Sequence, residues 1–176
     1  MTAHITDIGT TPALFLVAIL VMMVGLGVYL FFSMSETRTV MYITNAGLLA
    51  LTAMFGWFLY GAYNSTVTIE GDLLRVNVPI YGRAIALASV DAGKAEVVDL
   101  NQSSEYKLGI RTNGLGVPGY LLGWFRRSGG GRIYAVITDR SSVVYLPTTE
   151  DYAMLLSIEE PDALLEALGR TPANGP

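Results

Sequence analysis

Carboxylate side chains are the residues of this chain whose spacing comes closest to a catalytic or metal-binding arrangement. Two adjacent pairs occur near the C-terminus, Glu150–Asp151 and Glu159–Glu160. Paired carboxylates can act as general acid and base, or hold a hard cation. The first pair, however, falls in an expected turn. The second precedes Pro161 at an expected helix start, where acidic residues favour the positive end of the helix dipole. Each pair therefore has an ordinary structural explanation, and we predict no catalytic residue and no metal site.

The remaining composition narrows the chemistry further. Cysteine is absent, which excludes disulfides, thiolate catalysis and cysteine-ligated metals. The single histidine, His4, lies near the N-terminus, so a Ser-His-Asp triad or a histidine-based zinc site cannot form within the C-terminal part of one chain. From Asn64 onward there are ten Lys/Arg against thirteen Asp/Glu, a net charge of −3. Nucleic-acid binding needs a basic surface, so we expect no nucleic-acid partner.

One glycine-rich stretch looks like a cofactor motif. Residues 114–119 read GLGVPG, a literal G-x-G-x-x-G. A dinucleotide site requires a strand before this motif and a helix after it, within a βαβ unit. Here a strand-like segment, YLLGWF, follows, and no βαβ repeat is visible. We therefore expect no cofactor, and interpret residues 112–119 as a tight loop in which Gly114, Gly116 and Gly119 adopt positive φ.

Arginines gather around a second glycine run, residues 129–131, which lacks the Lys-Ser/Thr of a phosphate-binding loop and is predicted to be a hairpin tip. Arg126, Arg127 and Arg132 flank this tip, and residues 111–140 carry a net charge of +4. Guanidinium groups bind lipid phosphate or the carboxylates of a protein partner. Two interpretations remain open: an anion- or partner-binding site, or a solvated tip that balances the acidic remainder of the domain.

Two charge-free runs must anchor the elements that carry these residues. Residues 13–32 contain no charge and would form a helix of about 30 Å, the thickness of the hydrocarbon core of a bilayer. Residues 40–63 form a second, longer run, and aromatic residues crowd the end of each. Because backbone groups in lipid must bond internally, both runs are predicted to be helices. The short polar linker, residues 33–39, makes them an antiparallel hairpin.

The hairpin predicts a two-span protein of the cell membrane. Residues 1–12 are expected to be an N-terminal tail, on the same side of the membrane as the C-terminus. The side itself is undetermined, because Arg38 and Arg75 balance each other under the positive-inside rule.

Polar and small residues on the second helix suggest a packing surface. Asn45, Thr52 and Gly56 lie on one stripe, and Ala18 and Gly25 of the first helix could face them. We expect the stripe to pack within the hairpin or between protomers of a homo-oligomer. The alternative is that Asn45 lines a substrate path.

Residues 64–169 show the pattern of a separate, strand-rich domain. Seven or eight short strands alternate with turns every eight to twelve residues, beginning with two strands around Gly71-Asp72. An amphipathic helix follows from Pro161 and stops at Gly169. Residues 170–176 are predicted to be a disordered tail. The chain is thus expected to be an α+β membrane protein with a mostly-β domain and a C-terminal capping helix.

The order of motifs in this domain resembles the bacterial pleckstrin-homology-like (PH-like) family. The motifs are Y-G, R-T-N-G, P-G-Y and G-W-F-R, followed by T-x-x-x-Y and a P-x-x-L-L-x-x-L helix. The residues that carry the resemblance most directly are Tyr81, Gly82, Arg111, Thr112, Asn113, Gly114, Pro118, Gly119, Tyr120, Gly123, Trp124 and Phe125. The resemblance covers residues 66–168. It implies a strongly bent seven-stranded sandwich, or partly open barrel, closed at one end by the C-terminal helix. Members of the family often carry the domain after one or two membrane helices.

The resemblance implies less about function than about fold. Eukaryotic members bind phosphoinositides through basic residues around the first strand–strand turn, whereas here that turn is the acidic Glu70-Gly71-Asp72. We therefore predict a non-enzymatic, membrane-anchored binding or scaffold module whose partners are the lipid bilayer and a protein or a second copy of the chain. Two alternatives stay open. One is a sensor of anionic lipid surfaces that uses the arginine tip, and the other is an accessory subunit of a transporter or membrane enzyme.

Overall fold

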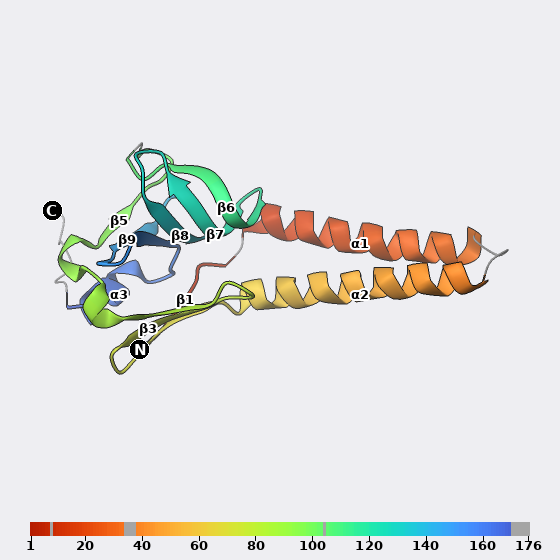
Figure 1. Ribbon diagram of the computed structural model, residues 1–176, viewed down its shortest axis with the longest axis horizontal. Helices are drawn as coiled ribbons and strands as arrows, with labels where there is room; N and C mark the ends of the chain where they lie inside the picture. The colour runs from red at the N-terminus through yellow and green to blue at the C-terminus, as the bar shows by residue number, and fades with distance from the viewer. Residues whose placement is uncertain (8, 34–37, 104, 170–176) are drawn as a thin grey trace.

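The computed structural model describes residues 1–7, 9–33, 38–103 and 105–169, and shows a helical hairpin projecting from a β-sandwich (Figure 1). Helices α1 (Thr10–Ser33) and α2 (Arg38–Tyr63) lie side by side. Within them, Ala13–Ser33 and Tyr42–Tyr63 are long and apolar enough to cross a membrane, by length and composition. Most of their large apolar side chains are exposed. Most of the predicted linker, residues 34–37, lies outside the described residues.

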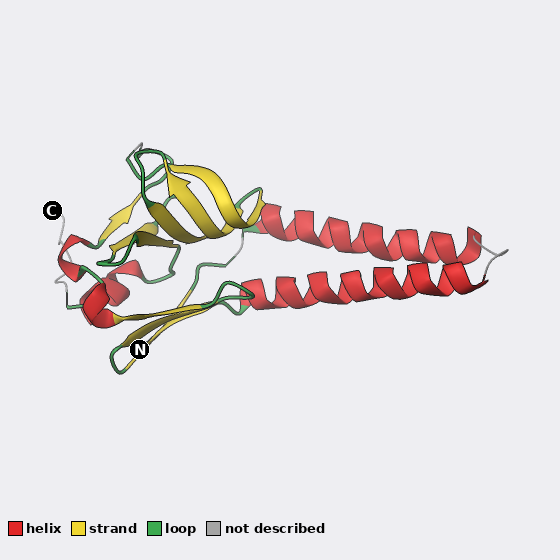
Figure 2. Cartoon of the chain, viewed as in Figure 1, coloured by secondary structure: helices red, strands yellow, loops and turns green. Residues whose placement is uncertain are grey.

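Two sheets make up the strand-rich domain (Figure 2). The first has the order β1-β2-β3-β4, with β1 (Thr2–His4), β2 (Thr66–Glu70), β3 (Leu73–Asn77) and β4 (Arg83–Ala86). The second has the order β5-β9-β10-β8-β7-β6, with β5 (Glu96–Val98), β6 (Leu108–Val117), β7 (Tyr120–Arg127), β8 (Arg132–Ile137), β9 (Val143–Pro147) and β10 (Tyr152–Leu156). Strands β8 and β10 are parallel, and the other paired strands are antiparallel. The sheets form a sandwich and not a closed barrel, which confirms the expected fold.

The main core lies between the two sheets, because alternate residues of each strand point to the same face. Leu74 of the first sheet and Leu122 and Met154 of the second are fully buried there. Helix α3 (Pro161–Ala167) adds Leu164 and Leu165 to this core, as expected of a C-terminal capping helix. A second, smaller cluster covers the opposite face of the six-stranded sheet.

The loop expected at residues 112–119 is wrong, because β6 runs through most of it and pairs with β7. The reason is the close contact between β6 and the neighbouring strand β7, which the local sequence does not show. A Cβ added to Gly114 would lie 2.2 Å from the carbonyl oxygen of Leu122, and one added to Gly123 would lie 2.5 Å from that of Asn113. Glycine at both positions therefore lets the two backbones approach closely.

The expected positive φ values hold at two of the three glycines. Gly114 has φ of 156° and Gly119, in the β6–β7 turn, has φ of 78°, whereas Gly116 is not in this region. Gly123, which was not expected to be special, has φ of 117°.

The N-terminal segment is part of the domain rather than only a tail. Strand β1 pairs with β2, and Ile5 forms a bridge to Ile158, which follows β10. Ala3 and Ile5 are buried, so the segment closes the sandwich by contacting both sheets. The predicted tail over residues 1–12 does not include this strand, because three residues give no readable period. The predicted disordered tail, residues 170–176, lies outside the described residues.

Only part of the predicted packing stripe, Asn45, Thr52 and Gly56, lies between the two helices. Asn45 and Thr52 line the groove between α1 and α2, opposite Gly27. Helices α1 and α2 approach each other closely at Gly27, since a Cβ there would lie 2.9 Å from Cδ2 of Leu48. A Cβ on Gly56 would meet no described atom within 4 Å. The expected partners of the stripe, Ala18 and Gly25, are exposed.

Candidate functional site

Trp124 is the centre of the site, and strand alternation decides which way it faces. Its neighbour Phe125 is buried in the outer cluster of the six-stranded sheet. Trp124 therefore points to the opposite face, toward the four-stranded sheet, where it is half-buried and packs against the main core. Its ring meets those of Tyr134 and Tyr152 edge-on, at centroid distances of 5.4 and 5.1 Å. Such edge-to-face contacts fix the orientation of the indole.

Two arginines from different sheets lie over the Trp124 ring. The guanidinium carbon of Arg83, at the start of β4, is 5.0 Å from the ring centroid, and that of Arg132, at the start of β8, is 4.7 Å away. Arg83 also lies 5.3 Å from the centroid of Tyr152. Because Arg83 pairs with Val76, whose side chain is buried, its own side chain starts on the core-facing side of the sheet. We refer to Arg83, Trp124, Arg132 and Tyr152 as the arginine–aromatic cluster.

The charge states within the cluster follow from these contacts. Contact with the Tyr152 hydroxyl raises the pKa of Arg83. Burial raises the pKa of Tyr152, although Arg83 acts in the opposite direction. At neutral pH Arg83 is therefore cationic and Tyr152 is a neutral phenol.

The three arginines predicted to form one tip are divided between the two faces of β7. Arg126 and Arg132 are cross-strand partners and so share a face. Arg127 lies on the other face, 5.5 Å from the ring centroid of Tyr106. The structure thus brings two of the predicted residues together and separates the third from them.

Acidic residues accompany two of these arginines. Arg132 Nη1 lies 3.1 Å from Asp151 Oδ2, and Arg127 Nη2 lies 3.2 Å from Glu105 Oε1. Among the described residues, Arg126 has no ion pair. A depression of about 200 Å³ beside the glycine tip includes Arg127, Arg132, Glu150 and Asp151 in its wall. The site is therefore an exposed surface of mixed charge.

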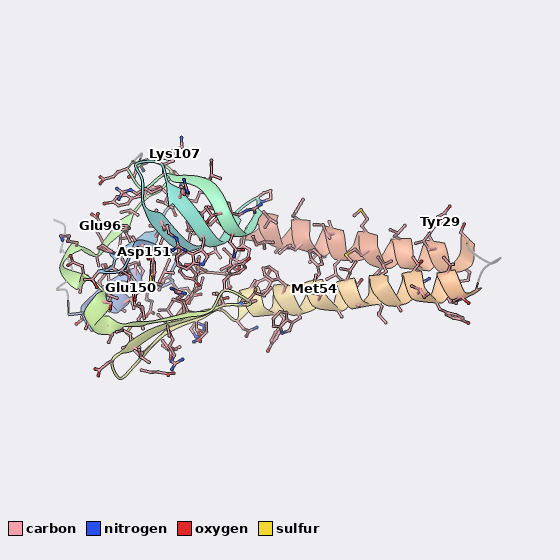
Figure 3. The ribbon with its side chains drawn as sticks, viewed as in Figure 1. Tyr29, Met54, Glu96, Lys107, Glu150 and Asp151 are labelled. Atoms are coloured by element: carbon pink, nitrogen blue, oxygen red, sulfur yellow. The ribbon has the colours of Figure 1, made fainter. Side chains whose placement is uncertain are left out.

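Trp124 and Arg126 lie along β7, away from the end of that strand that contacts the hairpin. Strand β7 begins at Tyr120, whose ring lies 6.2 Å from that of Phe58 on α2. At about 3.3 Å per residue, Trp124 is roughly 13 Å and Arg126 roughly 20 Å farther along the strand. Figure 3 shows Glu150 and Asp151 in the domain, well away from Met54 on α2.

The remaining motif residues hold the strands in place around the cluster. The Tyr81 hydroxyl donates to Oδ1 of Asn113 (3.0 Å), and the Tyr134 hydroxyl donates to the carbonyl of Tyr81 (2.7 Å). Thr112 Oγ1 donates to the carbonyl of Trp124 (3.1 Å). Pro118 and Gly119 form the β6–β7 turn. Gly82 is exposed and precedes β4. The Arg111 guanidinium lies close to Gly116. These contacts connect the segment before β4 to the six-stranded sheet.

Arg83 is the member of the cluster that could not be predicted from the sequence. No local pattern distinguishes it from other strand arginines, because its neighbours Trp124 and Tyr152 are 41 and 69 residues away in the chain.

Comparison with known proteins gives one result for this domain. The model of the family described as Bacterial PH domain matches residues 65–171. No curated protein and no solved structure matched the chain.

Proposed function

Because the chain belongs to the bacterial PH domain family, we propose that it is a non-enzymatic, membrane-anchored module that binds an acidic segment of a protein partner at the arginine–aromatic cluster. One observation carries the proposal: guanidinium groups from two different sheets lie over one indole. A guanidinium held over a ring keeps N–H donors at its edge, where they can bind carboxylates in pairs. The two candidate spans supply the anchor.

The ion pairs around the cluster are of a kind that a partner can replace. The side chains of Arg132 and Asp151 are 53% and 74% exposed. Exposed pairs contribute little free energy, typically about 0.2–1 kcal/mol. An incoming carboxylate could therefore take the place of Asp151 at Arg132, and Arg126 offers a second guanidinium on the same face.

The position of the cluster favours a protein over the alternative of an anionic lipid surface. A bilayer that holds the hairpin lies at the Tyr120 end of β7, roughly 20 Å from Arg126 by strand length. Screening in physiological salt reduces charge interactions beyond about 8 Å. Reorienting the domain would disturb a tight contact between helix and domain, where a Cβ on Gly61 would lie 2.3 Å from Cγ of Pro79.

The test is site-specific photocrosslinking of the full-length chain in its own cells. The full chain is needed because β1 and Ile5 belong to the domain. A photoreactive amino acid at position 126 should give a discrete adduct, and Arg83→Gln should reduce its yield at least fivefold. Arg75→Gln is the matched control, because Arg75 is exposed on β3 and pairs with Glu70 at 3.3 Å, outside the cluster. An adduct unaffected by Arg83→Gln would contradict the proposal.

Two further measurements separate the parts of the proposal. Carbonate washing should leave the chain in the membrane pellet, and its release into the supernatant would rule out membrane anchoring. The chain held in neutral nanodiscs should not bind added vesicles that contain phosphatidylglycerol. Salt-sensitive vesicle binding that is lost in Arg126→Gln would instead support the lipid alternative.

A further inference from the structure

An apolar cavity lies where the hairpin meets the domain. Its volume is about 340 Å³, within the range of small-molecule sites. Both helices contribute to its wall, for example through Leu16 and Trp57. The domain contributes Leu115 and Val117 of β6, and the Ile80-Tyr81 segment. The cavity is thus built jointly from the candidate membrane anchor and the PH domain.

Ile80, at the rim of this cavity, combines two unfavourable features. It has φ of 66°, in the left-handed region that β-branched residues rarely adopt. Its side chain is also 70% exposed despite being apolar. Backbone strain of this kind is often retained where it serves a function. An apolar occupant of the cavity would cover the Ile80 side chain, which would explain why the strained backbone is retained.

The depth of the cavity identifies that occupant. If the helices cross a bilayer, the domain-side ends of the spans are Ala13 and Tyr63. At about 1.5 Å per residue, Ile19 lies roughly 9 Å and Met54 roughly 14 Å inside those ends. Both residues contribute to the cavity wall. The deeper part of the cavity is therefore at the level of lipid acyl chains, and its domain side is at the level of the headgroups.

The domain wall of the cavity includes Leu115 and Val117, which share one face of β6. The walls themselves are held in place by contacts already described, the close approach of Gly61 to Pro79 and the hydrogen bond from Tyr81 to Asn113.

We propose that this junction cavity holds one acyl chain of a bilayer phospholipid. The proposal rests on the membrane anchoring proposed above and adds to it a specific lipid site between hairpin and domain. The bound chain would serve as part of the interface that fixes the domain against the membrane.

The test uses the full-length chain in nanodiscs that contain phosphatidylglycerol with a diazirine in the middle of one acyl chain. After irradiation, mass spectrometry should find adducts at Leu115, Val117 or Ile80 of the domain. Adducts should also form at Val21 and Leu49, which are 65% and 71% exposed on the helices and report insertion alone.

A cavity-filling variant makes the test specific. Leu115→Trp should lower the adduct yield at Val117 and Ile80 at least fivefold and leave the helix adducts unchanged. Ile110→Trp is the matched control, because Ile110 is on the same strand, is 78% exposed and does not contribute to the cavity. If Leu115→Trp does not fold, Ile80→Asn replaces it, since asparagine tolerates the left-handed backbone and removes the apolar rim.

The outcomes distinguish the two proposals. Helix adducts without domain adducts would overturn the lipid site and leave membrane anchoring intact. Absence of helix adducts would overturn the anchoring itself. Domain adducts that persist undiminished in Leu115→Trp would show contact with bulk lipid and not with a cavity, and would also overturn the inference.

Discussion

The two ends of strand β7 are built from opposite kinds of contact. At the hairpin end, Tyr120 is 1% exposed, and its hydroxyl has no hydrogen-bond partner among the residues that the structure describes. Burial raises the pKa of Tyr120. Toward the other end, Trp124 is half-buried beneath two guanidinium groups, and Arg126 is exposed. One strand therefore connects an apolar, buried end to a charged, accessible end.

This difference suggests that the two ends of the strand have different roles, attachment at one end and binding at the other. Apolar contacts at the hairpin end respond little to salt or pH, which suits a fixed attachment. The ion pairs at the remote end are exposed, and exposed pairs can be exchanged at little free-energy cost. Exchangeable contacts suit a binding surface.

The largest effect should come from adding one methyl group at Gly61, where helix α2 approaches the domain closely. In Gly61→Ala the new Cβ would lie 2.3 Å from Cγ of Pro79, whose ring cannot rotate away. We expect a loss of about 2 kcal/mol of unfolding free energy, since overpacking outweighs the better helix propensity of alanine. Thermal unfolding in nanodiscs measures it. Gly129→Ala, at the remote tip, meets no described atom within 4 Å and should change stability by less than about 0.5 kcal/mol. Equal effects at the two glycines would remove the contrast between the ends.

The parts of the fold that sequence could predict are those specified by local pattern. Charge-free runs predicted the spans at residues 13–32 and 40–63, and they lie within α1 and α2. The part of β6 from residue 112 onward was predicted to be a loop because its glycines resemble one, whereas Gly114 is needed because Gly123 lies opposite it on β7. Strand β1 was missed because its pairing with β2 joins residues more than 60 positions apart.

The candidate site was harder to predict than the fold, for the same physical reason. Arg126, Arg127 and Arg132 were identified from their spacing around the glycine tip. Their acidic neighbours were not, since Glu105 and Asp151 are 22 and 19 residues from the arginines they pair with. Whether the three arginines bind an anion or a partner stays a prediction.

A smaller effect should distinguish packing within the hairpin from packing between two copies. In Gly27→Leu the new side chain meets Cδ2 of Leu48 at 2.9 Å, and a flexible leucine can partly yield, so we expect a loss of about 1 kcal/mol. At Gly56 an added Cβ meets no described atom within 4 Å, so Gly56→Leu should leave the unfolding midpoint unchanged or raised. Unfolding and light scattering in detergent measure both variants. A destabilised or dissociated Gly56→Leu would show that Gly56 contacts a second copy or another subunit.

The smallest effect should be pH-dependent and confined to the charged part of the domain. The Tyr106 hydroxyl donates to Glu96, and this bond raises the pKa of Tyr106 to about 12, from an ordinary 10.0. A raised pKa in the folded state means that the stabilisation is present below about pH 10 and is lost as the pH rises toward 12. Tyr106→Phe keeps the ring against Tyr145 and Arg127 and removes only the hydroxyl.

We therefore expect wild type to exceed Tyr106→Phe by about 0.5–1 kcal/mol at pH 8, and this difference to shrink between pH 10 and 12. Thermal unfolding of both proteins across that range measures it. Burial also raises the pKa of Tyr134, so wild type loses stability at high pH through other groups. That loss occurs in both proteins and cancels in the difference. Tyr29→Phe, at the far end of α1 (Figure 3), is the control and should match wild type at each pH. A difference that does not change with pH would mean that packing of the ring, and not the bond to Glu96, stabilises this part of the domain.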